Sequence, residues 1–223
     1  MYIGKIIKNN LGSEWVILSI VGKKLTLESV SNSEILVVYE SSAKRGDFLG
    51  KFDKTVHGIG CNGYISKPFT KKDKMCWRDM ILRCLSNKGT ENCASYLSIK
   101  VSEDFLVFSK FLDWLHEQKP YSLIGDWQLD KDLFFNGYYS KESCCILPRE
   151  VNLSLIGIRS TRSNTGLTGV SFCKREKTYV AKIHKFGVHY NLGSFKSPID
   201  AYNTWKEAKL AHLQELAEKY KTY

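Results

Sequence analysis

Residues 166–212 read GLTGVSFCKREKTYVAKIHKFGVHYNLGSFKSPIDAYNTWKEAKLAH, and this stretch decides the fold of the C-terminal part of the chain. It contains three short segments in which apolar and polar residues alternate, the pattern of half-buried β-strands. The turn-forming sequences KREK and KFG divide these segments, and Ser197-Pro198 is a strong helix start. We therefore expect a three-stranded antiparallel sheet backed by one helix.

The middle segment predicts which side chains lie on each face of this sheet. If alternate residues from Tyr179 to Ile183 pack under the helix, Lys182 and His184 point away from it. The outer face then carries cations and hydrogen-bond donors that suit phosphates and base edges. The residues predicted to bind DNA on or around this face are Arg159, Arg162, Ser171, Lys174, Arg175, Lys182, His184 and His189.

Positive charge is concentrated in the same third of the chain. Residues 157–223 contain twelve Lys/Arg and five Asp/Glu, so +7 of the formal net charge of +10 lies there. Such a field attracts a polyanion, and the binding is expected to weaken as salt is added. A basic module can also be a solvated structural surface, so charge alone leaves both interpretations open.

The same segment resembles the DNA-binding domain of the plant ethylene-response-factor (Apetala) type, which is also common in phage endonucleases. The resemblance rests on Gly169-Val170 and on residues 179–183 (YVAKI), 192–195 (LGSF) and 200–202 (DAY). In that family the outer face of the sheet lies in the DNA major groove, as in other proteins that read DNA with β-strands. The resemblance therefore implies double-stranded DNA as the partner.

Composition places the chain among ordinary globular proteins, with 43% hydrophobic and 25% charged residues. No apolar run approaches the length of about 18 residues that suggests a membrane span. The seven cysteines form no C-x-x-C pair, which favours neither a structural zinc site nor a disulfide framework. We expect a soluble cytoplasmic protein with reduced thiols and no membrane partner, inside the host cell if the protein is phage-encoded.

Three segments are expected, at residues 1–64, 65–157 and 158–223, and together they predict an α+β protein. Short runs of strand-like residues separated by Gly, Asn and Ser fill the first segment and predict a small N-terminal β-barrel. This segment resembles the β-rich N-terminal module of phage HNH-type endonuclease-like proteins, through Lys44-Arg45-Gly46 and the glycine-rich run 58–64. That run also fits a dinucleotide fingerprint, but it lacks the strand-then-helix context, so we expect a connecting loop.

The middle segment switches to helical spacing, and its aromatic stripe is expected to be core. Its end carries the candidate chemistry. The sequence WQLDKDLFFNGYYS at 127–140, followed by CCILP at 144–148 and by Asn152, resembles the ββα-metal (HNH) nuclease core. In that family a strand ends in an Asp-His pair, and a helix supplies an Asn or His to a single metal site. By this resemblance Asp130 and Asn152 hold Mg²⁺ or another divalent cation.

Lys131 occupies the position of the general-base histidine in this resemblance. An unperturbed lysine, with a pKa of about 10.4, is protonated at neutral pH, so it cannot easily accept a proton from water. It could stabilise charge that develops on the phosphate. Some ββα-metal restriction enzymes carry a basic residue here and a tyrosine in a following Gly-Tyr-Ser, which makes Tyr139 the candidate base or water-orienting group.

These patterns predict a metal-dependent DNA endonuclease of phage homing or restriction type, with Asp130, Lys131, Tyr139 and Asn152 as catalytic residues. The alternative is a catalytically silent DNA-binding regulator on a degenerate HNH scaffold, in which Asp130 and Asp132 flank a turn and Tyr139 packs on the core. A third possibility is an interaction protein that acts through its N-terminal module. The oligomeric state and the target sequence stay open.

Overall fold

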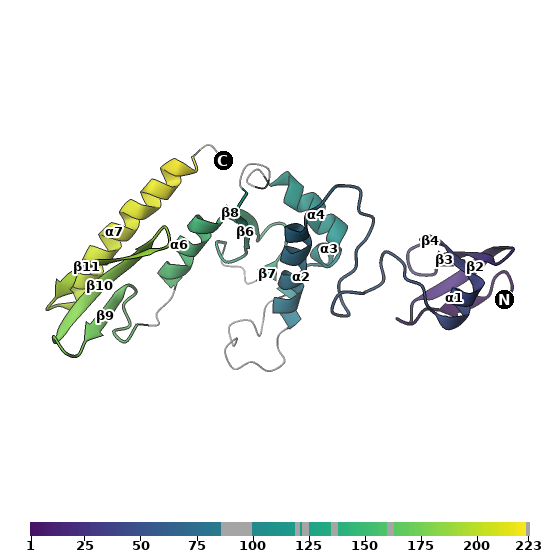
Figure 1. Ribbon diagram of the computed structural model, residues 1–223, viewed down its shortest axis with the longest axis horizontal. Helices are drawn as coiled ribbons and strands as arrows, with labels where there is room; N and C mark the ends of the chain where they lie inside the picture. The colour runs from purple at the N-terminus through teal and green to yellow at the C-terminus, as the bar shows by residue number, and fades with distance from the viewer. Residues whose placement is uncertain (86–99, 119–120, 122–124, 135–137, 160–162, 222–223) are drawn as a thin grey trace. The chain divides into compact units, whose positions relative to one another are not determined.

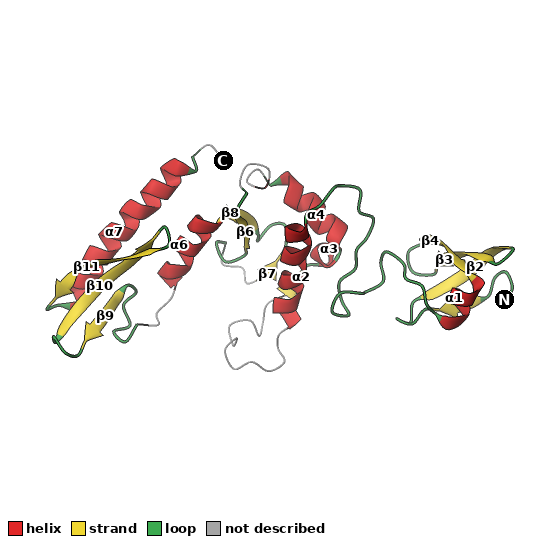
Figure 2. Cartoon of the chain, in the orientation of Figure 1, coloured by secondary structure: helices red, strands yellow, loops and turns green. Residues whose placement is uncertain are grey.

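The computed structural model describes residues 1–85, 100–118, 121, 125–134, 138–159 and 163–221. The chain divides into two compact units, and the fold class is α+β as predicted (Figures 1 and 2). The first unit consists of residues 1–115 and 131–144, and the second of residues 116–130 and 145–223. Among the described helices, none has the length and apolar content needed to cross a membrane.

An open antiparallel sheet forms the N-terminal part of the first unit. Its strands β1 (Ile6–Lys8), β2 (Glu14–Val21), β3 (Lys24–Ser29) and β4 (Ile35–Tyr39) pair in sequence order. The prediction of a β-barrel is wrong, because β1 and β4 are the two edges of this sheet and do not pair with each other. Closure requires the outermost strands to pair, and a three-residue β1 offers few backbone groups for a second partner.

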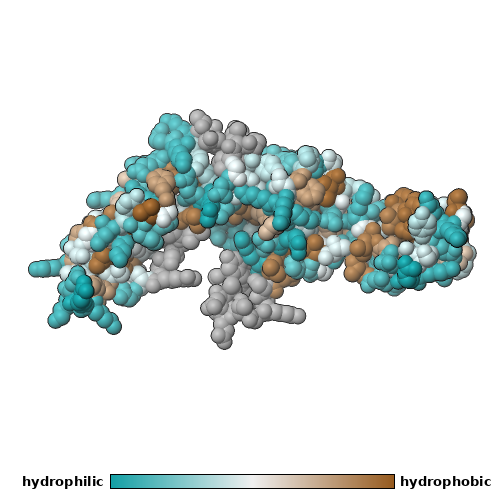
Figure 3. Space-filling model, viewed as in Figure 1, coloured by the Kyte–Doolittle hydropathy of each residue, from teal (hydrophilic) through white to brown (hydrophobic). Residues whose placement is uncertain are grey.

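One face of this sheet forms a core in which Trp15, Ile17, Leu25 and Leu27 are buried, together with Ala43 of helix α1 (Glu40–Arg45). The other face leaves apolar side chains exposed, and Figure 3 shows hydrophobic residues at the surface of this part. They include Ile6, Val21, Ile35, Val37 and Tyr39. The sheet is therefore covered on one side only by its own chain.

The helical part of the first unit contains α2 (Lys71–Leu85), β5 (Lys100–Val101), α3 (Glu103–Leu106) and most of α4 (Phe108–Glu117). Ser102 caps α3 by accepting a hydrogen bond from the Phe105 amide. The aromatic stripe is core, as expected: Trp77, Phe105, Phe108 and Phe111 are all buried. Strand β7 (Tyr138–Tyr139) pairs with β5 in parallel.

The second unit begins with a β-hairpin and a helix. Strand β6 (Trp127–Asp130) pairs antiparallel with β8 (Cys145–Pro148), and α6 (Arg149–Arg159) follows directly. Within the second unit the order is a strand, a strand and a helix, as the resemblance of residues 127–152 implied, but β7 of the first unit lies between β6 and β8 in the chain.

The C-terminal part confirms the three-stranded sheet backed by one helix. Strands β9 (Val170–Cys173), β10 (Thr178–Lys185) and β11 (Val188–Phe195) form an antiparallel sheet in the order β11-β10-β9. Helix α7 (Pro198–Lys219) packs on one face through Ala201 and Trp205. Ser197 caps α7 by accepting hydrogen bonds from the amides of Ile199 and Asp200.

Candidate nucleic-acid interface and ββα element

Strand β10 separates a buried face from an exposed face of the C-terminal sheet. Ala181 is 0% and Ile183 is 3% exposed, and both pack against α7, whereas Lys182 and His184 are exposed. The sequence predicted this division, because successive side chains in a strand point to opposite faces. The face turned away from α7 is therefore accessible to a partner.

Cross-strand neighbours extend this surface over all three strands. Val180 pairs with Ser171 on one side and Ser194 on the other, and His184 pairs with His189. The ring centroids of His184 and His189 lie 4.7 Å apart. We define the outer face as Ser171, Val180, Lys182, His184, His189, Asn191 and Ser194. Six of these seven side chains carry hydrogen-bonding groups, so the face is polar where the opposite face is apolar.

Of the other residues predicted to bind DNA, two lie in the turn between β9 and β10, one is at the end of α6 and one is outside the described residues. Lys174 and Arg175 are exposed in the turn between β9 and β10, where Arg175 forms an ion pair with Glu176 at 2.7 Å. Arg159 is the last residue of α6. Arg162 lies outside the described residues.

The β6–β8 hairpin and α6 bring two of the predicted metal ligands to one side of a strand. Asn152, on α6, donates a hydrogen bond from Nδ2 to Oε1 of Gln128 at 2.9 Å. Gln128 and Asp130 are two residues apart on β6, so their side chains point to the same face of the strand. Asn152 therefore lies over the face of β6 that carries Asp130.

Both side chains are withdrawn from solvent, with Asp130 6% and Asn152 7% exposed. The Oδ1 atom of Asn152 is buried and has no hydrogen-bond partner among the described residues. A buried amide oxygen over the strand face that carries a carboxylate fits a hard divalent cation, since such ions take oxygen ligands and Mg²⁺ is often held by few protein groups. No cluster of three or more His, Cys, Asp or Glu side chains able to hold a metal occurs within the described part of the chain.

Lys131 and Tyr139 belong to the first unit, whereas Asp130 and Asn152 belong to the second. The Nζ atom of Lys131 donates to the carboxylate of Asp132 and lies 5.8 Å from the ring centroid of Tyr139. Tyr139 is 2% exposed, and its backbone oxygen accepts a hydrogen bond from Ser102. Lys131 is thus a buried cation with an acidic partner. This partner is Asp132, the next residue in the chain, and the sequence did not predict the pairing.

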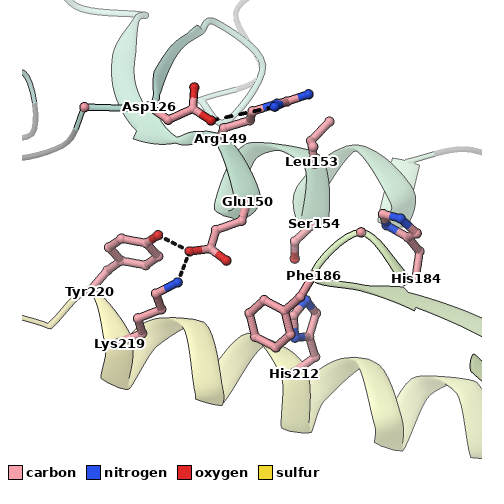
Figure 4. Close-up of a pocket in the computed structure, with 12 residues that line it drawn as sticks. Asp126, Arg149, Glu150, Leu153, Ser154, His184, Phe186, His212, Lys219 and Tyr220 are labelled. Atoms are coloured by element: carbon pink, nitrogen blue, oxygen red, sulfur yellow. Dashed lines mark hydrogen bonds and ion pairs between the residues drawn. The ribbon is translucent and has the colours of Figure 1, made fainter. Parts of the chain in front are cut away.

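Helices α6 and α7 meet at a pocket of about 820 Å³ that was not predicted from the sequence. Glu150 on α6 accepts hydrogen bonds from Lys219 and Tyr220 at the end of α7 (Figure 4). Farther along, the buried Nζ of Lys209 donates to the backbone oxygen of Ser154 at 2.6 Å. These contacts connect the helix that carries Asn152 to the helix that backs the sheet.

His212 lies in the wall of this pocket and is 2% exposed. Its ring meets Phe186 edge to face, with centroids 4.9 Å apart, and Nδ1 lies 3.5 Å from the Glu215 carboxylate without forming a hydrogen bond. Burial lowers the pKa of His212 below its ordinary value of 6.5, and Glu215 only partly opposes this effect. Lys209 and His212 share a helix face with the apolar residues Trp205 and Leu216, and this was the signal in the sequence, since polar side chains on an apolar helix face need polar partners.

Comparison of the chain with models of known protein families, with curated proteins and with solved structures found no match.

Proposed function

We propose that this protein is a metal-dependent DNA endonuclease of phage homing or restriction type that binds duplex DNA through the outer face. The observation that carries the DNA-binding proposal is the exposed polar surface of a sheet whose opposite face is packed against α7. Lys182 and His184 supply cationic and donor groups, and the serines and Asn191 supply hydrogen-bonding groups at the positions between them. This chemistry fits contacts to phosphates and to base edges in the major groove.

The ββα element supports the catalytic part of the proposal. Asp130 and Asn152 would hold a divalent cation, which, when bound, supplies Lewis-acid stabilisation of the scissile phosphate and the leaving oxygen. Lys131, the next residue in the chain, carries a positive charge that balances charge on the phosphate. Tyr139 is our candidate for orienting the attacking water, a role that rests on the resemblance of residues 137–140 to the Gly-Tyr-Ser of ββα-metal restriction enzymes.

A second candidate function is a DNA-binding regulator that has lost cleavage. The ion pair between Lys131 and Asp132 favours it, because a buried lysine held by a carboxylate occupies the position of a general base. The two candidates share the outer face and differ only in the chemistry at Asp130.

The DNA-binding proposal is tested by the salt dependence of duplex binding. Fluorescence anisotropy with a labelled duplex compares the wild type with Lys182→Ala, and Lys23→Ala removes the same charge from an exposed turn of the N-terminal sheet. Loss of one phosphate contact lowers the slope of log K against log salt by about 0.9, and Lys23→Ala should leave the slope unchanged. Equal effects of the two substitutions would remove the outer face from the proposal.

Cleavage is tested on supercoiled plasmid with Mg²⁺ or Mn²⁺. Asp130→Asn should abolish nicking while duplex binding stays intact, and Asp113→Asn, at an exposed ion pair on α4, should cleave as the wild type does. Absence of cleavage by the wild type with both metals, together with normal duplex binding, would select the silent regulator. Cleavage that survives Asp130→Asn would place the metal elsewhere.

A further inference from the structure

A second pocket lies in the first unit and takes no part in the function proposed above. It has a volume of about 490 Å³ and is lined by Lys51, Asn62, Gly63, Tyr64, Ile65, Ser66, Phe69 and Lys74. These lining residues include two lysines, one side-chain amide and two hydroxyl groups, and none of them is an aspartate or glutamate. The pocket therefore presents donors and positive charge to whatever enters it.

Both lysines lie against aromatic rings. Lys51 Nζ is 4.0 Å from the ring centroid of Tyr64, and Lys74 Nζ is 3.8 Å from that of Phe108 and 4.4 Å from that of Trp77. Lys74 also donates a hydrogen bond to Oδ1 of Asn62. Neither lysine has a salt bridge to a carboxylate among the described residues. In the described part of the chain, the two ammonium groups contact ring faces and an amide, and the nearby carboxylate of Glu34 binds the backbone amide of Lys51 instead, so an anion would find two cations without a salt bridge.

The position of Lys74 disfavours the charged form of its side chain. Burial, with a smaller contribution from Arg78, lowers the pKa of Lys74 to about 8. The ammonium group is therefore charged at neutral pH but held where charge is disfavoured. A bound anion would relieve this cost, because an opposite charge at short range stabilises the protonated form.

Aromatic side chains at the pocket offer a second kind of contact. Tyr64 is 51% and Phe69 is 45% exposed, although large aromatic side chains are commonly buried. Each ring packs edge to face against another ring. The ring centroids of Phe52 and Tyr64 lie 5.4 Å apart, and those of Phe108 and Phe69 lie 5.1 Å apart. Exposed, supported rings beside lysines are the combination that proteins use to bind single-stranded nucleic acid, with bases on the rings and phosphates on the cations.

We propose that this pocket binds an unpaired nucleotide of single-stranded DNA, with Lys51 and Lys74 on the phosphate and Tyr64 and Phe69 on the base. The volume is within the range of small-ligand pockets. A free nucleotide shares this chemistry and is distinguished by experiment. The pocket belongs to the first unit, whereas the outer face and Asp130 belong to the second, so the proposal stands whether or not the protein cleaves DNA.

The test measures binding of a fluorescein-labelled ten-residue oligothymidylate and, by competition, of thymidine 5′-monophosphate. The full chain carries Lys182→Ala in every sample, so that any contribution of the outer face is reduced equally. Tyr64→Ala is compared with Tyr39→Ala, which removes a similarly exposed tyrosine that also has a lysine over its ring, at 5.7 Å. Lys74→Met is compared with Lys71→Met, an exposed lysine one turn earlier on α2.

Tyr64→Ala and Lys74→Met should each weaken oligonucleotide binding by about tenfold or more, and the two controls should not. Competition by the mononucleotide at similar concentration would identify a free nucleotide as the occupant of the same site, and absence of competition would identify the strand. If binding is unchanged in Tyr64→Ala and Lys74→Met, or changes equally in the controls, the pocket does not bind nucleotides. Failure of duplex binding or of plasmid cleavage would leave this result untouched.

Discussion

Replacement of Gly169 by alanine is expected to destabilise the C-terminal sheet. The lost free energy of unfolding has two parts, the strain of the backbone and a steric clash of the new Cβ atom. Gly169 has φ of +76°, and a Cβ atom there would lie 2.1 Å from Cδ1 and 2.2 Å from Nε1 of Trp205. Gly166 has nearly the same conformation, with φ of +73°, but a Cβ atom there would have no neighbour within 4 Å. The two glycines therefore share the backbone cost and differ in the steric clash.

The backbone cost of placing an L-residue in the left-handed region is about 1–2 kcal/mol. Displacing Trp205, which is 7% exposed in the core of this sheet, adds about 1–3 kcal/mol of overpacking. Gly169→Ala should thus lose about 2–5 kcal/mol and Gly166→Ala about 1–2 kcal/mol. Duplex binding should weaken in Gly169→Ala, since the same packing holds the outer face in place.

Hydrogen exchange followed by mass spectrometry is the suitable assay because it reports on the sheet separately from the rest of the chain. The opening free energy of β10 amides should fall by the amounts given above. Peptides from α2, in the other unit, serve as an internal control and should not change. If β10 opens equally in the two variants, Trp205 does not pack on Gly169, and the orientation of the sheet on α7 is wrong.

Three further changes test the contact between α6 and α7. The lowered pKa of His212 means that the unfolded state binds more protons below pH 6.5, so stability present above pH 6.5 is lost as the pH falls. His212→Gln should flatten that loss in urea unfolding, and an unchanged pH dependence would contradict its burial. Lys209→Met should cost about 1 kcal/mol and speed exchange in α7, because relief of desolvation offsets part of the lost hydrogen bond to Ser154. Glu150→Gln should speed hydrogen exchange only at the C-terminal end of α7, where Lys219 forms an ion pair with Glu150. Faster exchange along the whole of α7 would show that this ion pair does not act locally.

Sequence patterns within a few residues predicted most of the fold of the C-terminal part. Alternation along β10 separated Ala181 and Ile183 from Lys182 and His184, and the Ser197 cap marked the start of α7. Both signals depend on neighbours within a few residues, so no knowledge of the remaining chain was needed. The short strand-like runs predicted between the Gly, Asn and Ser residues of the first segment are also strands, β2, β3 and β4.

Long-range relations were beyond these signals. Barrel closure depends on whether the first and last strands meet, and the alternation within each strand is the same in an open sheet. The contact of Asn152 with Gln128 joins residues 24 positions apart, and that of Lys209 with Ser154 joins residues 55 apart. Polar contacts of this kind are fixed by tertiary packing, and no spacing in the sequence encodes them.

The half-satisfied amide of Asn152 bears on the choice between a structural and a functional ββα element. Gln128 accepts from its nitrogen, but the buried Oδ1 has no hydrogen-bond partner among the described residues, and an unsatisfied buried acceptor costs about 1–3 kcal/mol. An apolar side chain at this position would remove that cost and would give up only the hydrogen bond to half-buried Gln128, which contributes about 1 kcal/mol. A purely structural helix therefore gains little from asparagine here. A cation shared with Asp130 would satisfy the oxygen, and sites that break a packing rule in this way are where function is expected.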